Sequence, residues 1–212
     1  KAHTILAKTK YYDNMNKRYL SMSKEIKEGI FNEDEASEYG SLKFLFSESG
    51  DISTSHSIKA GKRYEKWFAE IVKDNIKSTG GSILPHGILP NLLKDGKNKD
   101  VDLLYDQGNG NIYYRELKGN INLDTEKLPA TAEKVKAVTK RVQEMYPDKV
   151  VEGAVLFWGI FDFEKDLNTT IKNKIKRFKD YGVDVIFPKQ LFDSIGFSCT
   201  KQEYMKYFRE SE

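Results

Sequence analysis

The segment from residue 101 to residue 118 reads VDLLYDQGNGNIYYRELK, and it decides how this chain folds. An apolar run at 101–105 leads into a polar, glycine-containing stretch at 106–111, and a second apolar and aromatic run follows at 112–117. Two such runs separated by a short turn are typical of an antiparallel β-hairpin. We therefore predict two paired strands at the centre of the fold.

The hairpin places three chemically useful side chains near one another. Side chains two positions apart on a strand point to the same face, so Glu116 and Lys118 share a face. Asp102 precedes Glu116 by about the length needed to leave one strand, turn and return beside it. Two carboxylates and a lysine suit phosphodiester cleavage, because oxygen ligands hold a hard cation and the lysine supplies charge beside the attacking water.

Helix and strand patterns flank the hairpin on both sides. Apolar residues recur at three- and four-residue intervals from about Ile58 to Ile76, with Ser57 as the expected N-cap. Downstream, we predict a helix at 131–146, a buried strand at 150–161, a helix at 167–181, a buried strand at 183–187 and a terminal helix at 201–209. These elements predict an α/β fold in which helices flank a central mixed β-sheet.

The length of 212 residues fits one domain. Within it we expect an N-terminal helical region at 1–57, a catalytic core at 58–187 and C-terminal helices at 188–212. The net charge of +3, from 35 basic and 32 acidic residues, is too even to indicate nucleic-acid binding by itself. No apolar run approaches the roughly 18 residues of a membrane helix, and the single Cys199 suggests a reducing compartment. We expect a soluble cytoplasmic protein without membrane contacts.

An acidic residue, a spacer and then acidic-x-Lys on a hairpin form the pattern of the PD-(D/E)xK nucleases, which this chain resembles at Asp102 and at Glu116-Leu117-Lys118. Many members carry a glycine, three residues and a glutamate on the upstream helix, and the stretch from Gly61 to Glu65 fits. Residues 119–127, with the helix and strand that follow, resemble type II restriction enzymes in particular. The resemblance covers roughly residues 58–187, and no proline precedes Asp102.

The resemblance implies a restriction-endonuclease-like fold and sequence-specific cleavage of double-stranded DNA in a bacterial cytoplasm. The reaction would be Mg²⁺-dependent hydrolysis that leaves 5′-phosphates. Asp102 and Glu116 would hold one or two Mg²⁺ ions, with Asp100 as a rival for the first ligand position. Lys118 would position the attacking water or help to deprotonate it, and Glu65 would be a further ligand or would hold water.

Several polar residues are candidate DNA contacts because they follow the motif directly, and His56, before the upstream helix, is a further candidate for which a plain loop role is the favoured alternative. The residues that follow the motif are Asn120, Asn122, Thr125 and Lys127. Cutting both strands of a palindromic site requires two active centres related by a two-fold axis, so we expect a homodimer. The alternative functions are a structure-specific repair or junction-resolving nuclease of the same fold, and a noncatalytic DNA-binding module.

Overall fold

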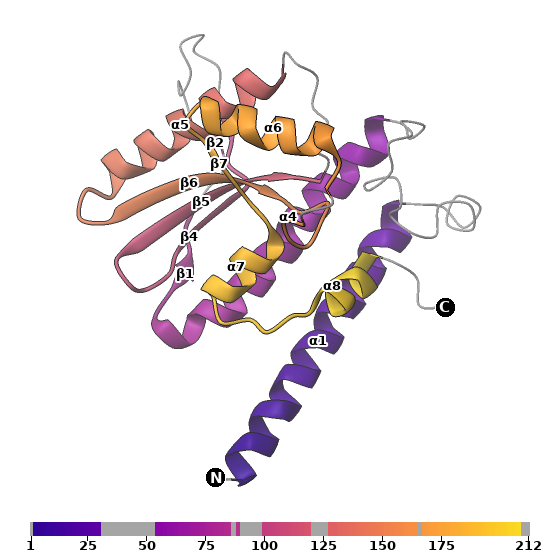
Figure 1. Ribbon diagram of the computed structural model, residues 1–212. Helices are drawn as coiled ribbons and strands as arrows, with labels where there is room; N and C mark the ends of the chain where they lie inside the picture. Colours follow the sequence, from indigo (N-terminus) through magenta and orange to yellow (C-terminus); the bar gives the residue numbers. More distant parts are fainter. Residues whose placement is uncertain are drawn as a thin grey trace. The chain divides into compact units, whose positions relative to one another are not determined.

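The computed structural model forms two compact units, Lys1–Trp67 with Thr200–Glu212, and Phe68–Cys199. It describes residues 2–30, 54–85, 88–89, 99–119, 127–164 and 167–208 (Figure 1). The boundary between the units falls inside one continuous helix, α4 (Thr54–Ile76). None of the described helices, the 29-residue α1 included, is long and apolar enough to cross a lipid bilayer.

The first unit is helical and has an aromatic core. It contains α1 (Ala2–Ile30), the first part of α4 and α8 (Lys201–Phe208). The indole of Trp67, which is fully buried, donates a hydrogen bond of 3.0 Å to the carbonyl oxygen of Tyr19, and its ring packs edge-on against Tyr207. The hydroxyls of Ser23 and Tyr64 hydrogen-bond at 2.9 Å. The indole N–H of Trp67 and the hydroxyl of Tyr64 therefore each have a hydrogen-bond partner, as burial of a polar group requires.

The second unit is built on a five-stranded sheet with the order β1-β4-β5-β6-β7. Its strands are β1 (Ser82–Ile83), β4 (Leu103–Asp106), β5 (Asn111–Lys118), β6 (Val150–Phe157) and β7 (Asp184–Ile186). Pairing is antiparallel from β1 to β5 and parallel from β5 to β7, which confirms the predicted mixed sheet. A separate pair, β2 (Ile88–Leu89) and β3 (Lys99–Asp100), is antiparallel.

Helices cover both faces of this sheet (Figure 1). α5 (Lys127–Met145) and α6 (Thr169–Asp180) lie on one face, where Val135, Val138 and Val142 of α5 are buried in one cluster with Val155 of β6. The last part of α4 and α7 (Pro188–Ser194) lie on the other. Each fully buried side chain of this size contributes roughly 1.5–3 kcal/mol, so packing on α5 holds β5 and β6 in place.

The tight turn between β4 and β5 fixes the register of the hairpin. Gly108 has a φ of +81°, and a Cβ built there would lie 2.2 Å from the carbonyl oxygen of Thr79, so no other residue fits. Its N–H donates to Asp106 Oδ1 at 2.8 Å. Leu103 pairs with Arg115 as a result, which brings the residue before Leu103 beside the residue after Arg115.

Four predicted boundaries were wrong. β4 begins at Leu103, so Asp102 precedes the strand, and β6 ends at Phe157, where the chain turns. α4 begins at Thr54, so Ser57 lies inside the helix and is not its N-cap. α5 begins at Lys127, earlier than predicted. The helix can include Pro129 because an N–H in the first helical turn has no helical acceptor, so its absence costs no hydrogen bond.

Candidate active site

The centre of the site is the carboxylate of Glu116 on β5, which is only 2% exposed. Lys118 Nζ lies 2.9 Å from its Oε1, and Lys134 Nζ lies 2.7 Å from its Oε2. The hydroxyl of Tyr114 also donates to Oε2, at 2.6 Å. A buried carboxylate is costly unless it is paired and hydrogen-bonded, and here three donors from two elements meet that requirement.

Strand alternation and helix packing explain why these groups meet. Tyr114, Glu116 and Lys118 are two positions apart on β5 and so face the same side of the sheet. α5 packs on that side, and Lys134 is carried on it between the buried residues Ala132 and Val135. The cluster therefore depends on the strand and on the helix that follows it.

The two lysines hold Glu116 in its charged form. Burial alone would raise the pKa of the Glu116 carboxyl, but the charges of Lys118 and Lys134, with the hydrogen bonds from Lys134 and Tyr114, lower the pKa to about 2. The ordinary value is 4.5. The folded state therefore binds a proton at Glu116 less readily than the unfolded chain does, so ionised Glu116 stabilises the fold.

This shift predicts an acid-side loss of stability that is specific to Glu116. The contribution is complete above the unfolded pKa, is lost as the pH falls toward about 2, and is on the order of 3 kcal/mol at neutral pH. We expect the difference in unfolding free energy between the wild type and Glu116→Gln to shrink between about pH 5 and pH 2. Urea denaturation in metal-free buffer measures it. A difference that stays constant over this range would contradict the lowered pKa.

Asp102 lies beside the same strand. Its Oδ2 accepts a hydrogen bond of 2.8 Å from the backbone N–H of Leu117, and its side chain is half-buried. Asp100, the rival candidate, is exposed and lies in β3, where it pairs with Ile88 of β2. Among the described contacts, it is therefore Asp102 whose carboxylate reaches the strand that carries Glu116.

The end of β5 is anchored by the chain that follows β6. The carbonyl oxygen of Lys118 accepts a hydrogen bond of 3.0 Å from the N–H of Trp158. Gly119 lies against the same residue, since a Cβ built on it would be 2.7 Å from the Trp158 ring. A larger residue at 119 would push the strand end away from the indole. These contacts fix the backbone from which the Lys118 side chain, 28% exposed, projects.

The structure places the other predicted site residues less fully. Glu65 is half-buried on α4 and belongs to the first unit, whereas Glu116 belongs to the second. Lys127 is exposed and begins α5. His56 lies on α4, and not in the loop predicted before it, but its side chain is outside the described residues. Asn120, Asn122 and Thr125 are outside them as well.

Two members of the cluster were not predicted as functional residues. Tyr114 packs in the core at 0% exposure, and its hydroxyl also reaches Glu116. Lys134 was not singled out at all. Its sequence signal was only its position beside the apolar stripe of α5, four residues before the buried Val138, and a lysine in such a position usually forms a solvated edge.

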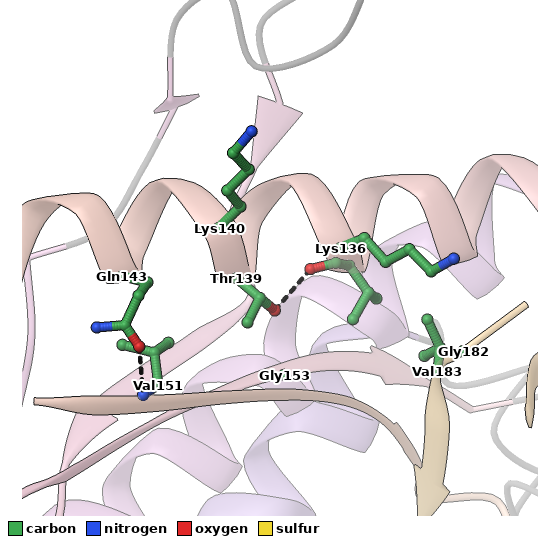
Figure 2. Close-up of a pocket in the computed structure, with 9 residues that line it drawn as sticks. Lys136, Thr139, Lys140, Gln143, Val151, Gly153, Gly182 and Val183 are labelled. Atoms are coloured by element: carbon green, nitrogen blue, oxygen red, sulfur yellow. Dashed lines mark hydrogen bonds between the residues drawn. The ribbon is translucent and has the colours of Figure 1, made fainter.

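A pocket of about 350 Å³ lies elsewhere on α5, over the start of β6 (Figure 2). Two of its polar side chains bond within the protein, because Thr139 Oγ1 donates to Val135 O and Gln143 Oε1 accepts from Val151 N. None of the predicted site residues lines it. In the part of the chain that the structure describes, no group of three or more His, Cys, Asp or Glu side chains is arranged to hold a metal ion.

No family model, no curated protein and no solved structure matches the sequence.

Proposed function

We propose that this chain is a Mg²⁺-dependent endonuclease that cuts double-stranded DNA at a specific sequence, as a PD-(D/E)xK restriction enzyme does. The observation that carries the proposal is the buried Glu116 carboxylate, which Lys118 contacts, beside the Asp102 carboxylate, which accepts a hydrogen bond from the N–H of Leu117. Acid, acid and lysine at the end of a hairpin match the residues that the chemistry needs.

The donor set fits a hard divalent ion. Asp102 and Glu116 supply carboxylate oxygens, which Mg²⁺ prefers. Proteins usually hold Mg²⁺ with one or two carboxylates, and waters and phosphate complete its coordination, so no third acidic residue is needed. These two residues would hold it. When bound, the ion would offset negative charge on the scissile phosphate and lower the cost of forming the transition state.

The protein's own groups have separate tasks in hydrolysis. The oxygen of water forms a bond to phosphorus, the bond from phosphorus to the 3′ oxygen breaks, and one proton of the water ends on that oxygen. Lys118 can donate hydrogen bonds to the water and to the phosphate, because it is the more exposed of the two lysines on Glu116. The two lysines keep the buried Glu116 carboxylate charged in surroundings of low polarity, where electrostatic interactions are strong.

The working form that we propose is a homodimer acting on both strands of a palindromic site, with each copy cutting one strand. Exposed Lys127 at the start of α5 follows the residues after the catalytic strand, and we propose that it contacts a backbone phosphate.

Cleavage is expected to require Mg²⁺. The purified protein should convert phage DNA into discrete fragments with 5′-phosphate ends, and excess EDTA should stop the reaction. Ca²⁺ should support binding with little cutting, because its looser coordination organises the water poorly. Fragment ends are read by ligation and sequencing.

The same assay, run on branched junctions and on plain duplex DNA, distinguishes the alternative functions. Cutting of branched junctions with no cutting of plain duplex would favour a structure-specific nuclease, and binding of both without cutting would favour a noncatalytic module. Discrete fragments that persist in EDTA would contradict the metal-dependent mechanism.

A further inference from the structure

The two oxygens of the Glu116 carboxylate have different surroundings. Oε2 receives two donors, the Lys134 ammonium at 2.7 Å and the Tyr114 hydroxyl at 2.6 Å. Tyr114 is fully buried, and the Lys134 side chain is 14% exposed. Oε1 receives Lys118 at 2.9 Å, and that side chain is twice as exposed. Access from solvent is therefore easier on the Oε1 side.

We propose that Lys134 takes the place of a second divalent ion, so that the site holds a single ion, on the Oε1 side of Glu116. This inference rests on the proposed nuclease function and makes Lys134 a positioning residue, since it acts on Glu116 and not on the reacting atoms. Lys118 keeps the catalytic role.

Charge favours a single ion. The two carboxylates and the two lysines of the site are together neutral. One divalent ion and one phosphodiester bring the total to a single positive charge, whereas two ions would bring it to three. Like charges this close repel strongly when they are partly buried. Lys134 thus supplies, from the protein, positive charge that a second ion supplies in two-metal sites.

Packing favours Lys134 as the lysine that stays. Its backbone lies within α5 between Ala132 and Val135, which are buried at 1% exposure each. A second ion at Oε2 would have to displace Lys134, because the fully buried Tyr114 hydroxyl occupies the other acceptor position of that oxygen. Lys118, at the end of β5, can instead turn from Oε1 toward water or phosphate as an ion binds.

The test counts bound ions with Mn²⁺, whose electron paramagnetic resonance signal separates free from bound metal. The wild type should bind one Mn²⁺ that is lost in Glu116→Gln. Lys134→Met, which keeps an unbranched side chain one atom shorter and removes its charge, should bind two. Lys136→Met is the matched control, because it removes a lysine from the exposed side of the same helix, and it should bind one.

The outcomes distinguish failure of the single-ion inference from failure of the proposed nuclease function. Two ions in the wild type, both lost in Glu116→Gln, would overturn the inference and leave the nuclease function standing. One ion in both the wild type and Lys134→Met would also overturn it. No ion that depends on Glu116 would overturn the inference and the proposed function together. If Lys134→Met does not fold, Lys134→Gln, which also removes the charge but keeps a polar side chain, replaces it with the same expected count of two.

Discussion

Replacing Lys118 with alanine is expected to slow DNA cleavage by roughly 10²–10⁴-fold while DNA binding changes little. Lys118 Nζ contacts Glu116 and is the more exposed of its two lysine partners, so it is placed to act on water and phosphate in the transition state. An interaction made only in the transition state lowers the rate and spares binding. Single-turnover cleavage in Mg²⁺ and gel-shift binding in Ca²⁺ measure the two effects.

The fold should survive this change, because Lys134 and Tyr114 still hold the Glu116 carboxylate. Lys136→Ala is the control, since it removes an exposed lysine of α5 that is not part of the cluster. Its cleavage rate should equal that of the wild type. If Lys118→Ala also cuts at the wild-type rate, Lys118 has no role in the chemistry.

The hairpin was predictable because its information is local. The turn at 106–111 contains glycines that adopt positive φ, and the apolar runs beside it are the right length to pair. Once the turn is fixed, alternation alone puts Glu116 and Lys118 on one face. The mixed sheet followed from the same kind of evidence, since the helix at 127–145 joins two strands that pair in parallel.

The contacts of Glu116 were not predictable in the same way. Lys134 reaches it only because α5 packs across β5, and that depends on the registration of a helix face against a sheet. The sequence shows a lysine beside an apolar stripe, which is common and is usually a solvated edge. The start of α4 was missed for a different reason, because its first turn, at 54–57, is polar and continues no apolar pattern.

The strand pattern of the sequence does not distinguish Asp100 from Asp102 as the first metal ligand. Alternation puts both acids on one face, so it cannot rank them. The structure separates them because β4 begins only at Leu103, leaving Asp102 to bend its carboxylate onto the N–H of Leu117 while Asp100 belongs to a different strand pair. The interruption between two short strands, here at residues 101–102, cannot be recognised in the hydrophobic pattern.

Asp102→Asn is therefore expected to reduce cleavage about as strongly as loss of Lys118, by roughly 10³-fold or more. The asparagine oxygen can still accept the hydrogen bond from Leu117 N–H, so the local backbone keeps its contact and only the charge is lost. Binding of DNA without divalent ions should stay equal or become tighter, because a negative charge next to the phosphate has been removed. A purely structural aspartate would not tighten binding.

Asp100→Asn is the matched control, since it makes the same change two residues earlier on an exposed side chain. It should retain cleavage within a few-fold of the wild type and show a similar gain in metal-free DNA affinity only if its carboxylate also lies near the phosphate. Cleavage rates and metal-free binding of the two variants are measured in parallel. If Asp100→Asn is inactive and Asp102→Asn is active, the first metal ligand is Asp100, and the hydrogen bond from Leu117 to Asp102 only supports the hairpin.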